Sequence, residues 1–275
     1  MNESRAMKSY GDQAGAYYGS VRPSRGLALV LGTGEIASAI AAVMHSRGWS
    51  VILSHDADTA VLRRSHAYYD ALFGDAVTLD GIAARQGSSR VEIERILAAG
   101  DAVVVTPLDL MDLIVLGPFD LLIDARMQDG APKPELRWLA GLSFGVGAGW
   151  FGGVNCDMSL RLPLAEAEPQ AITTAPQSGY WYTAIEPGMR VYRHLDIGKA
   201  GGATVRAPCD GVVQGILRDG LRVRAGMPLI EIHPRLRKAL AGTINPCGRD
   251  IGRQIAAAAS SMIRGMDGVL STVAG

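Results

Sequence analysis

A glycine-rich turn is the first part of the chain whose residue types suggest chemistry. It reads Gly32-Thr33-Gly34-Glu35-Ile36-Ala37 and lies between an apolar run and an alanine-rich segment. In such a turn the first glycine permits a tight bend, and the second lets a phosphate approach the backbone. The N-terminus of the following helix attracts the anion with its dipole and its unpaired N–H groups. Unless the glycines serve packing alone, we expect phosphate contacts at Gly32, Thr33, Gly34 and Glu35.

The end of the second apolar run bears on which nucleotide would bind. An acidic residue at this place holds the ribose hydroxyls in dinucleotide-binding folds, but this sequence has Ser54, followed by His55 and Asp56. Either Asp56 substitutes for it, or the pair Arg63 and Arg64 receives a phosphate. The arginine pair is equally consistent with a solvated helix face. The identity of the nucleotide therefore stays open.

Two later segments are candidates for the same crevice. Asp124 ends the apolar segment LLIDAR, where it would either face the ligand or cap the following turn. The stretch from Gly145 to Gly153 could offer backbone donors to an anion, act as a hinge, or permit tight packing. Because ligands bind beyond the carboxyl ends of strands in open α/β sheets, we include Asp124, Gly147 and Gly149 in the predicted site.

Catalytic and metal-binding patterns are absent from the sequence. It contains no G-x-S-x-G or H-E-x-x-H motif, and its five histidines are scattered. The three cysteines, Cys156, Cys209 and Cys247, have no metal-ligand spacing and cannot form a paired disulfide framework. Cys156 lies near the glycine stretch, but a small buried thiol is the commoner explanation. We predict no metal site, and whether the protein is an enzyme stays open.

The elements that position these residues alternate between strand and helix in the first part of the chain. Apolar runs at 27–31, 51–53, 102–105 and 121–123 predict buried parallel strands. Periodic segments predict helices at 36–45, 59–72 and 91–99. This alternation is typical of a doubly wound, Rossmann-like α/β sheet. We assign a flexible tail to residues 1–25 and a nucleotide-binding domain to residues 26–170.

The pattern changes after Pro169. From Gly179 to His233 short alternating strands are separated by Asp-Gly and Ala-Gly turns, which predicts a small barrel or sandwich over 171–245. The segment Glu186–Val191, a turn followed by a strand, is a weaker copy of the later hairpin. Two such related units would give an internally symmetric barrel. An alanine-rich stretch from about Arg249 predicts a closing helix within 246–275.

Composition limits the partners. The 275 residues include 27 Lys plus Arg and 27 Asp plus Glu, and this balance argues against a nucleic-acid partner, which favours basic proteins. The sequence has no run of 18 apolar residues and no signal-peptide pattern. We therefore expect a soluble, cytoplasmic protein without a membrane partner.

The ordered set of motifs resembles one family, the selenium-dependent molybdenum hydroxylase accessory proteins, which are related to the xanthine dehydrogenase accessory proteins. The similar segments are the run Thr59–Arg64 and LGTGEIASAIA, LLIDAR, GVGAGWFGGVNCD, VRAPCDGVVQGILRDGLRVRAGMPLIEIHPR and IGRQIAAA. The resemblance implies a Rossmann-like domain followed by a barrel of the biotinyl/lipoyl-carrier type. It also implies a maturation role toward a molybdenum hydroxylase client. The cofactor stays open, with a nucleotide, NAD(P) and the molybdenum cofactor as candidates. The chain departs from the family at Ser54 and at Met127-Gln128-Asp129, where we expect acidic and basic residues respectively.

Three alternatives compete with this interpretation. An NAD(P)-dependent oxidoreductase would need an acid–base pair that the sequence does not reveal. A carrier protein would present a modified lysine, but Lys199 has neighbours Gly198 and Ala200 instead of the flanking methionines of carriers. A ligand-free scaffold is the third alternative. Under the accessory-protein interpretation, the barrel would dock onto the client enzyme or onto a second copy in a homo-oligomer.

Overall fold

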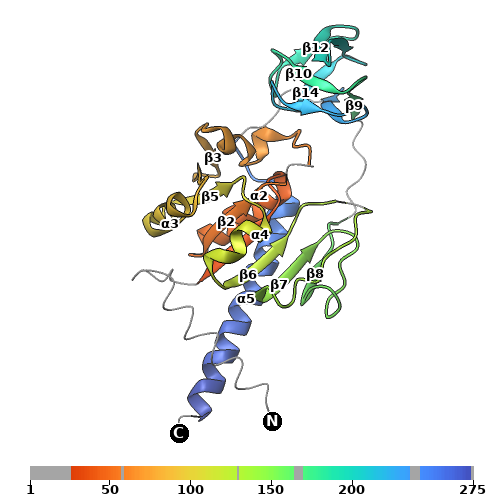
Figure 1. Ribbon diagram of the computed structural model, residues 1–275. Helices are drawn as coiled ribbons and strands as arrows, with labels where there is room; N and C mark the ends of the chain where they lie inside the picture. Colours follow the sequence, from red (N-terminus) through yellow and green to blue (C-terminus); the bar gives the residue numbers. More distant parts are fainter. Residues whose placement is uncertain (1–25, 57–58, 129, 164–169, 236–241, 274–275) are drawn as a thin grey trace.

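The computed structural model describes residues 26–56, 59–128, 130–163, 170–235 and 242–273 (Figure 1). The tail assigned to residues 1–25 lies outside this part, as does Asp129. The described chain is a mixed α/β protein with one large, mostly parallel sheet, two smaller antiparallel sheets and a long C-terminal helix.

The large sheet has eight strands in the order β3-β4-β5-β2-β1-β6-β7-β8. Every neighbouring pair is parallel except β3 and β4. Apart from β3 and β4, the strands follow the order 3-2-1-4-5-6 that is typical of doubly wound nucleotide-binding sheets. The bounds are β1 Leu27–Leu31, β2 Ser50–Ser54, β3 Val77–Leu79, β4 Ile82–Gln86, β5 Ala102–Thr106, β6 Phe119–Asp124, β7 Ala140–Val146 and β8 Met158–Leu160.

Both faces of the sheet are buried at its centre. Strand β1 is apolar at every position because Ala28 and Val30 enter one hydrophobic core while Leu27, Leu29 and Leu31 enter the other. Helices α2 (Glu35–Ser46) and α5 (Pro246–Val273) cover the first face, and α3 (Arg90–Ala99) and α4 (Leu110–Leu113) cover the second. The predicted strands and the helices at 36–45 and 91–99 are thus confirmed to within a few residues.

The helix predicted over 59–72 was wrong. The segment contains only two short 3₁₀ helices, η1 (Arg64–His66) and η2 (Tyr69–Phe73); a third, η3 (Ile114–Leu116), follows α4. The backbone of this segment bonds to distant partners, because Leu62 O accepts the Ile216 N–H at 2.8 Å and Tyr68 N donates to Ser38 Oγ at 2.9 Å. These tertiary bonds replace the i to i−4 ladder that a helix would need.

The segment after 170 forms two four-stranded antiparallel sheets, ordered β13-β12-β10-β15 and β11-β14-β16-β9. The two short Arg-Val strands, β11 and β15, are edge strands of the two different sheets. This equivalent placement is expected if the segment consists of two related hairpin units. Trp181 is fully buried between the sheets. We refer to this pair of sheets as the barrel, and both its closed form and its carrier type stay predictions. The bounds are β9 Ala171–Thr174, β10 Gly179–Tyr182, β11 Arg190–Val191, β12 Asp196–Ala200, β13 Ala203–Arg206, β14 Gly211–Ile216, β15 Arg222–Val223 and β16 Pro228–His233.

After the barrel the chain returns to the large sheet, where α5 packs along α2 (Figure 1). The helix begins at Pro246, a favoured first helical residue, rather than near Arg249. Gly248 and Gly252 permit this close approach. A Cβ on Gly248 would lie 2.6 Å from Ala39 Cβ, and one on Gly252 would lie 2.9 Å from Val43 Cβ.

Filling this contact should destabilise the protein. We expect Gly248→Leu to lower the free energy of unfolding by about 1–3 kcal/mol, because the added carbons have no space against α2. Arg253→Leu is the matched control, since that side chain is 56% exposed on the same helix. Urea denaturation followed by circular dichroism measures both variants, and equal midpoints would contradict the packing role of Gly248.

Candidate functional site

The carboxyl ends of β1, β2, β6 and β7 meet at one edge of the large sheet, because these strands are adjacent and parallel. The chain leaves β1 toward β2 on one side and later returns to β6 on the other. Crevices at such a reversal of strand order are the usual ligand sites of open α/β sheets. The described residues that follow these four strands form the candidate site.

The two glycines after β1 have different surroundings. Gly32 has φ +105°, and a Cβ there would lie 3.0 Å from Ala125 O and 3.1 Å from Arg126 Cα. Gly34 is the N-cap of α2, and a Cβ on it would meet no atom within 4 Å. No side chain caps the helix at this residue. The fold therefore requires glycine at position 32, while position 34 faces open space at the start of a helix.

A polar pair lies beneath this turn. Thr33 Oγ1 is 2.8 Å from His55 Nδ1, and the His55 ring makes an edge contact with Tyr69 at 5.2 Å between centroids. Burial lowers the pKa of His55, and the nearby Asp56 carboxylate only partly opposes this effect. Ser54, by contrast, is buried and donates to Leu108 O at 2.7 Å. Ser54 supports the backbone, and His55 is the residue of this strand end that lies beside the glycine turn.

Asp124 orients an arginine at the same edge. Its Oδ1 accepts the Arg126 backbone N–H at 3.1 Å, and its Oδ2 accepts Arg126 Nε at 3.0 Å and Nη2 at 2.5 Å. Arg126 Nη1 lies 3.8 Å from Asp56 Oδ2, which also accepts from Gln128 Nε2. Asp124 thus caps the turn after β6 and holds Arg126 toward the end of β2. Arg126 was not among the predicted site residues, although its place two residues beyond Asp124 was a usable signal.

Arg63 and Arg64 lie at the junction with the barrel. Arg63 makes a bidentate pair with Glu231, at 3.0 and 2.7 Å, and its Nη1 is 3.4 Å from Glu35 Oε1. Arg64 is 8% exposed and pairs with Asp70 at 2.7 Å. That these arginines receive a phosphate stays a prediction. A ligand would, however, share each of them with a carboxylate.

The two glycines predicted near β7 differ in position. Gly147 directly follows the strand, with φ +99°, and a Cβ there would lie 3.1 Å from Met127 Cε. Gly147 therefore lies at the carboxyl edge of the large sheet. Gly149 lies beside Lys133, whose Nζ donates to Gln128 O at 2.6 Å.

Other groups that could react are occupied or buried. Cys156 is buried, and burial raises the pKa of its thiol. The neighbouring Asp157 carboxylate accepts both the backbone N–H and the hydroxyl of Ser143, at 2.7 and 2.6 Å. Within the described residues, no group of three or more His, Cys, Asp or Glu side chains is placed to hold a metal ion.

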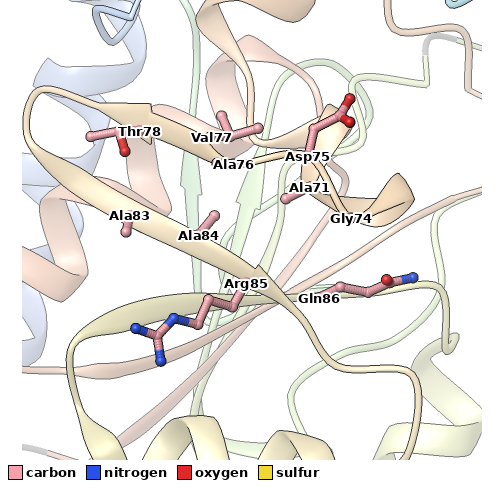
Figure 2. Close-up of a pocket in the computed structure, with 10 residues that line it drawn as sticks. All are labelled: Ala71, Gly74, Asp75, Ala76, Val77, Thr78, Ala83, Ala84, Arg85 and Gln86. Carbon is pink, nitrogen blue, oxygen red and sulfur yellow. The ribbon is translucent and has the colours of Figure 1, made fainter.

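A shallow hollow of about 310 Å³ lies between η2 and the β3–β4 hairpin (Figure 2). Three of its polar side chains already have partners. Asp75 pairs with Arg218 at 2.6 Å, Arg85 pairs with Asp101 at 2.7 Å, and Gln86 donates to Leu72 O at 2.6 Å. The hollow is otherwise lined largely by alanines, so it offers a ligand little that would fix its orientation.

Comparison with known proteins adds one distant relative. No protein-family model matches the chain. The uncharacterized protein YqeB of Escherichia coli (strain K12) is 25% identical over 251 residues, which cover 82% of this chain and 46% of that protein. The chain thus spans less than half the length of this relative, whose name states no activity. No helix within the described residues is long and apolar enough to cross a membrane.

The half-buried histidines His55 and His45 predict a stability that falls in acid. Burial lowers the pKa of both His55 and His45 below the ordinary value of 6.5, so the unfolded chain takes up protons first as the pH falls. The stabilisation is present above that ordinary value and is lost toward the folded-state pKa. We expect His55→Gln to reduce the loss in free energy of unfolding between about pH 7.5 and pH 5.5. Urea denaturation of both proteins at the two pH values measures this loss. If His55→Gln loses as much stability as the wild-type protein, His55 is not a source of the pH dependence.

Proposed function

We propose that this protein is an accessory factor in the maturation of a molybdenum hydroxylase. In this role it binds a nucleotide, or the nucleotide end of the molybdenum cofactor, where β1 meets α2. The observation that carries the binding proposal is Gly34, which leaves open space at an uncapped helix N-terminus. The maturation role rests on the resemblance of the ordered motifs to the accessory family.

The edge of the sheet suits a phosphate in three respects. The first N–H groups of α2 point toward the space over Gly34, and a helix N-terminus favours an anion. Gly32 keeps the turn close to the backbone after β6. Arg126, held by Asp124, supplies a guanidinium beside that turn. Burial by itself would lower the pKa of Arg126, but the hydrogen bonds and charge of Asp124 outweigh this effect and raise the pKa.

The same edge favours an unmodified ribose. Asp56 lies just beyond β2, where a carboxylate can accept the ribose hydroxyls. A 2′-phosphate would instead meet that carboxylate and be repelled by it. Among dinucleotides we therefore favour NAD over NADP.

The site supports binding better than turnover. The acidic side chains Glu35, just after β1, and Asp124, at the end of β6, are both held by arginines, and burial lowers the pKa of His55 beside the glycine turn. This arrangement lacks the positioned acid–base pair that an oxidoreductase would need.

The barrel fits a docking role better than that of a carrier. Lys199 lies within β12, paired with Tyr182 on one side and Thr204 on the other, while Gly201-Gly202 form the hairpin turn. A carrier lysine would be expected on such a turn. The rings of Tyr180 and Tyr182 are stacked and more than half exposed, which suits an interface with the client or with a second copy.

The phosphate site is tested at Gly34. Thermal shift measurements with NAD, NADP, ATP, CTP, CDP and isolated molybdenum cofactor should reveal a ligand. A ligand present at 100 times its Kd raises the free energy of unfolding by about 2.7 kcal/mol. Gly34→Asp should abolish that shift, because its carboxylate occupies the space and repels phosphate. The variant should still fold, since aspartate is a favoured N-cap. Gly34→Ala, which adds a methyl group and no charge, is the milder control. If no compound in the panel shifts the melting temperature of the wild-type protein, the proposal is contradicted.

Selection at the ribose is tested separately. We expect Asp56→Asn to narrow the difference between NAD and NADP, because it removes the charge that repels a 2′-phosphate. Isothermal titration with both dinucleotides measures the ratio of the two Kd values. An unchanged ratio would show that Asp56 does not face the ribose.

A further inference from the structure

We propose that the barrel completes the nucleotide site, because Glu231 on β16 orients Arg63 toward the first turn of α2, where Arg63 contacts the ligand phosphate. This inference rests on the proposed nucleotide site. It makes Arg63 a ligand-binding residue and Glu231 a positioning residue that belongs to the other domain.

The guanidinium of Arg63 has two edges with different partners. Nε and Nη2 donate to the two carboxylate oxygens of Glu231, at 3.0 and 2.7 Å. The remaining Nη1 lies 3.4 Å from Oε1 of Glu35, the first residue of α2. The bidentate pair therefore fixes the plane of the guanidinium and leaves Nη1 directed at the helix N-terminus.

The two carboxylates differ in how firmly they hold Arg63. The side chain of Glu231 is 6% exposed, and Arg63 is its one ion-pair partner within the described part of the chain. Separating a buried pair leaves an uncompensated charge, so this contact should persist. Glu35 is 25% exposed, makes the longer contact, and also accepts from Asn245 Nδ2 at 2.9 Å. Glu35 can therefore give up Nη1 to a phosphate and keep a partner.

This geometry couples ligand binding to docking of the barrel. If the barrel separates from α2, Glu231 no longer orients Arg63 and the phosphate loses a cation. By linkage, a ligand that holds Arg63 must stabilise the docked barrel by the same free energy. The backbone bond from Ile216 N to Leu62 O, at 2.8 Å across the same junction, reports on docking.

The test is a double-mutant cycle with NAD and CDP as probes. Arg63→Gln should weaken binding about tenfold or more, as loss of a charge-assisted hydrogen bond does. Glu231→Gln should also weaken binding, but should have no further effect in the Arg63→Gln background. Glu35→Gln should strengthen binding, because it frees Nη1 and removes a like charge. Circular dichroism checks that each variant is folded.

Glu186→Gln is the matched control. Glu186 contacts Arg64 at the same junction, at 3.4 Å, but has no contact with Arg63. It should leave the affinity unchanged. In the wild-type protein, the ligand should slow hydrogen exchange at the Ile216 amide, and it should do so less in Glu231→Gln.

The outcomes separate this inference from the proposed function. If the wild-type protein binds a probe and Glu231→Gln binds it equally well, the coupling is overturned while the nucleotide site stands. Equal weakening by Glu186→Gln would also overturn it, since the effect would then come from the junction in general. If the wild-type protein binds neither NAD nor CDP, both the coupling and the proposed site for these ligands fail.

Discussion

The rest of the structure depends on the burial of α2 between the large sheet and α5. Nine of its twelve residues are buried, so the helix needs small side chains on more than one face. On the side toward α5, Ala39 and Val43 lie against Gly248 and Gly252. A helix enclosed in this way has little freedom to move, so its N-terminus is held in a fixed position at the end of β1. This rigidity is what a binding site built from backbone groups requires.

The route of the chain gives the same helix a second role. Since α5 follows the barrel in sequence but packs on α2, the barrel is anchored to the sheet by the chain on both sides. The junction itself is largely polar. Arg64 is almost fully buried there, and its Nε donates to Ile216 O at 2.9 Å. A junction of directional hydrogen bonds fixes one orientation of the barrel more strictly than an apolar contact of similar size. It also loses more free energy when one partner moves, because a buried polar group is then left unpaired.

Local patterns predicted the elements that depend on neighbouring residues. The strand, glycine turn and helix around Gly32 follow from apolar runs and alanine content, and the stop of α3 follows from Gly100, which is in the left-handed conformation. The false helix over 59–72 shows the limit. Its residues have helical periodicity, but their polar groups bond to Ile216 and Glu231, more than 150 positions away. The candidate site divides similarly: Asp124 and Arg126 are two residues apart, whereas the partners of Arg63 could not be found without the fold.

The contrast between Gly32 and Gly34 bears most directly on function. At position 32 the left-handed backbone and the contact with Ala125 explain the glycine fully. At position 34 neither reason applies, because φ is −71° and the space beyond is open. Serine or aspartate would fit that backbone and cap the helix, which glycine does not do. Glycine is itself an accepted N-cap residue but cannot make this side-chain bond, and the proposed approach of a ligand to the backbone would account for its presence.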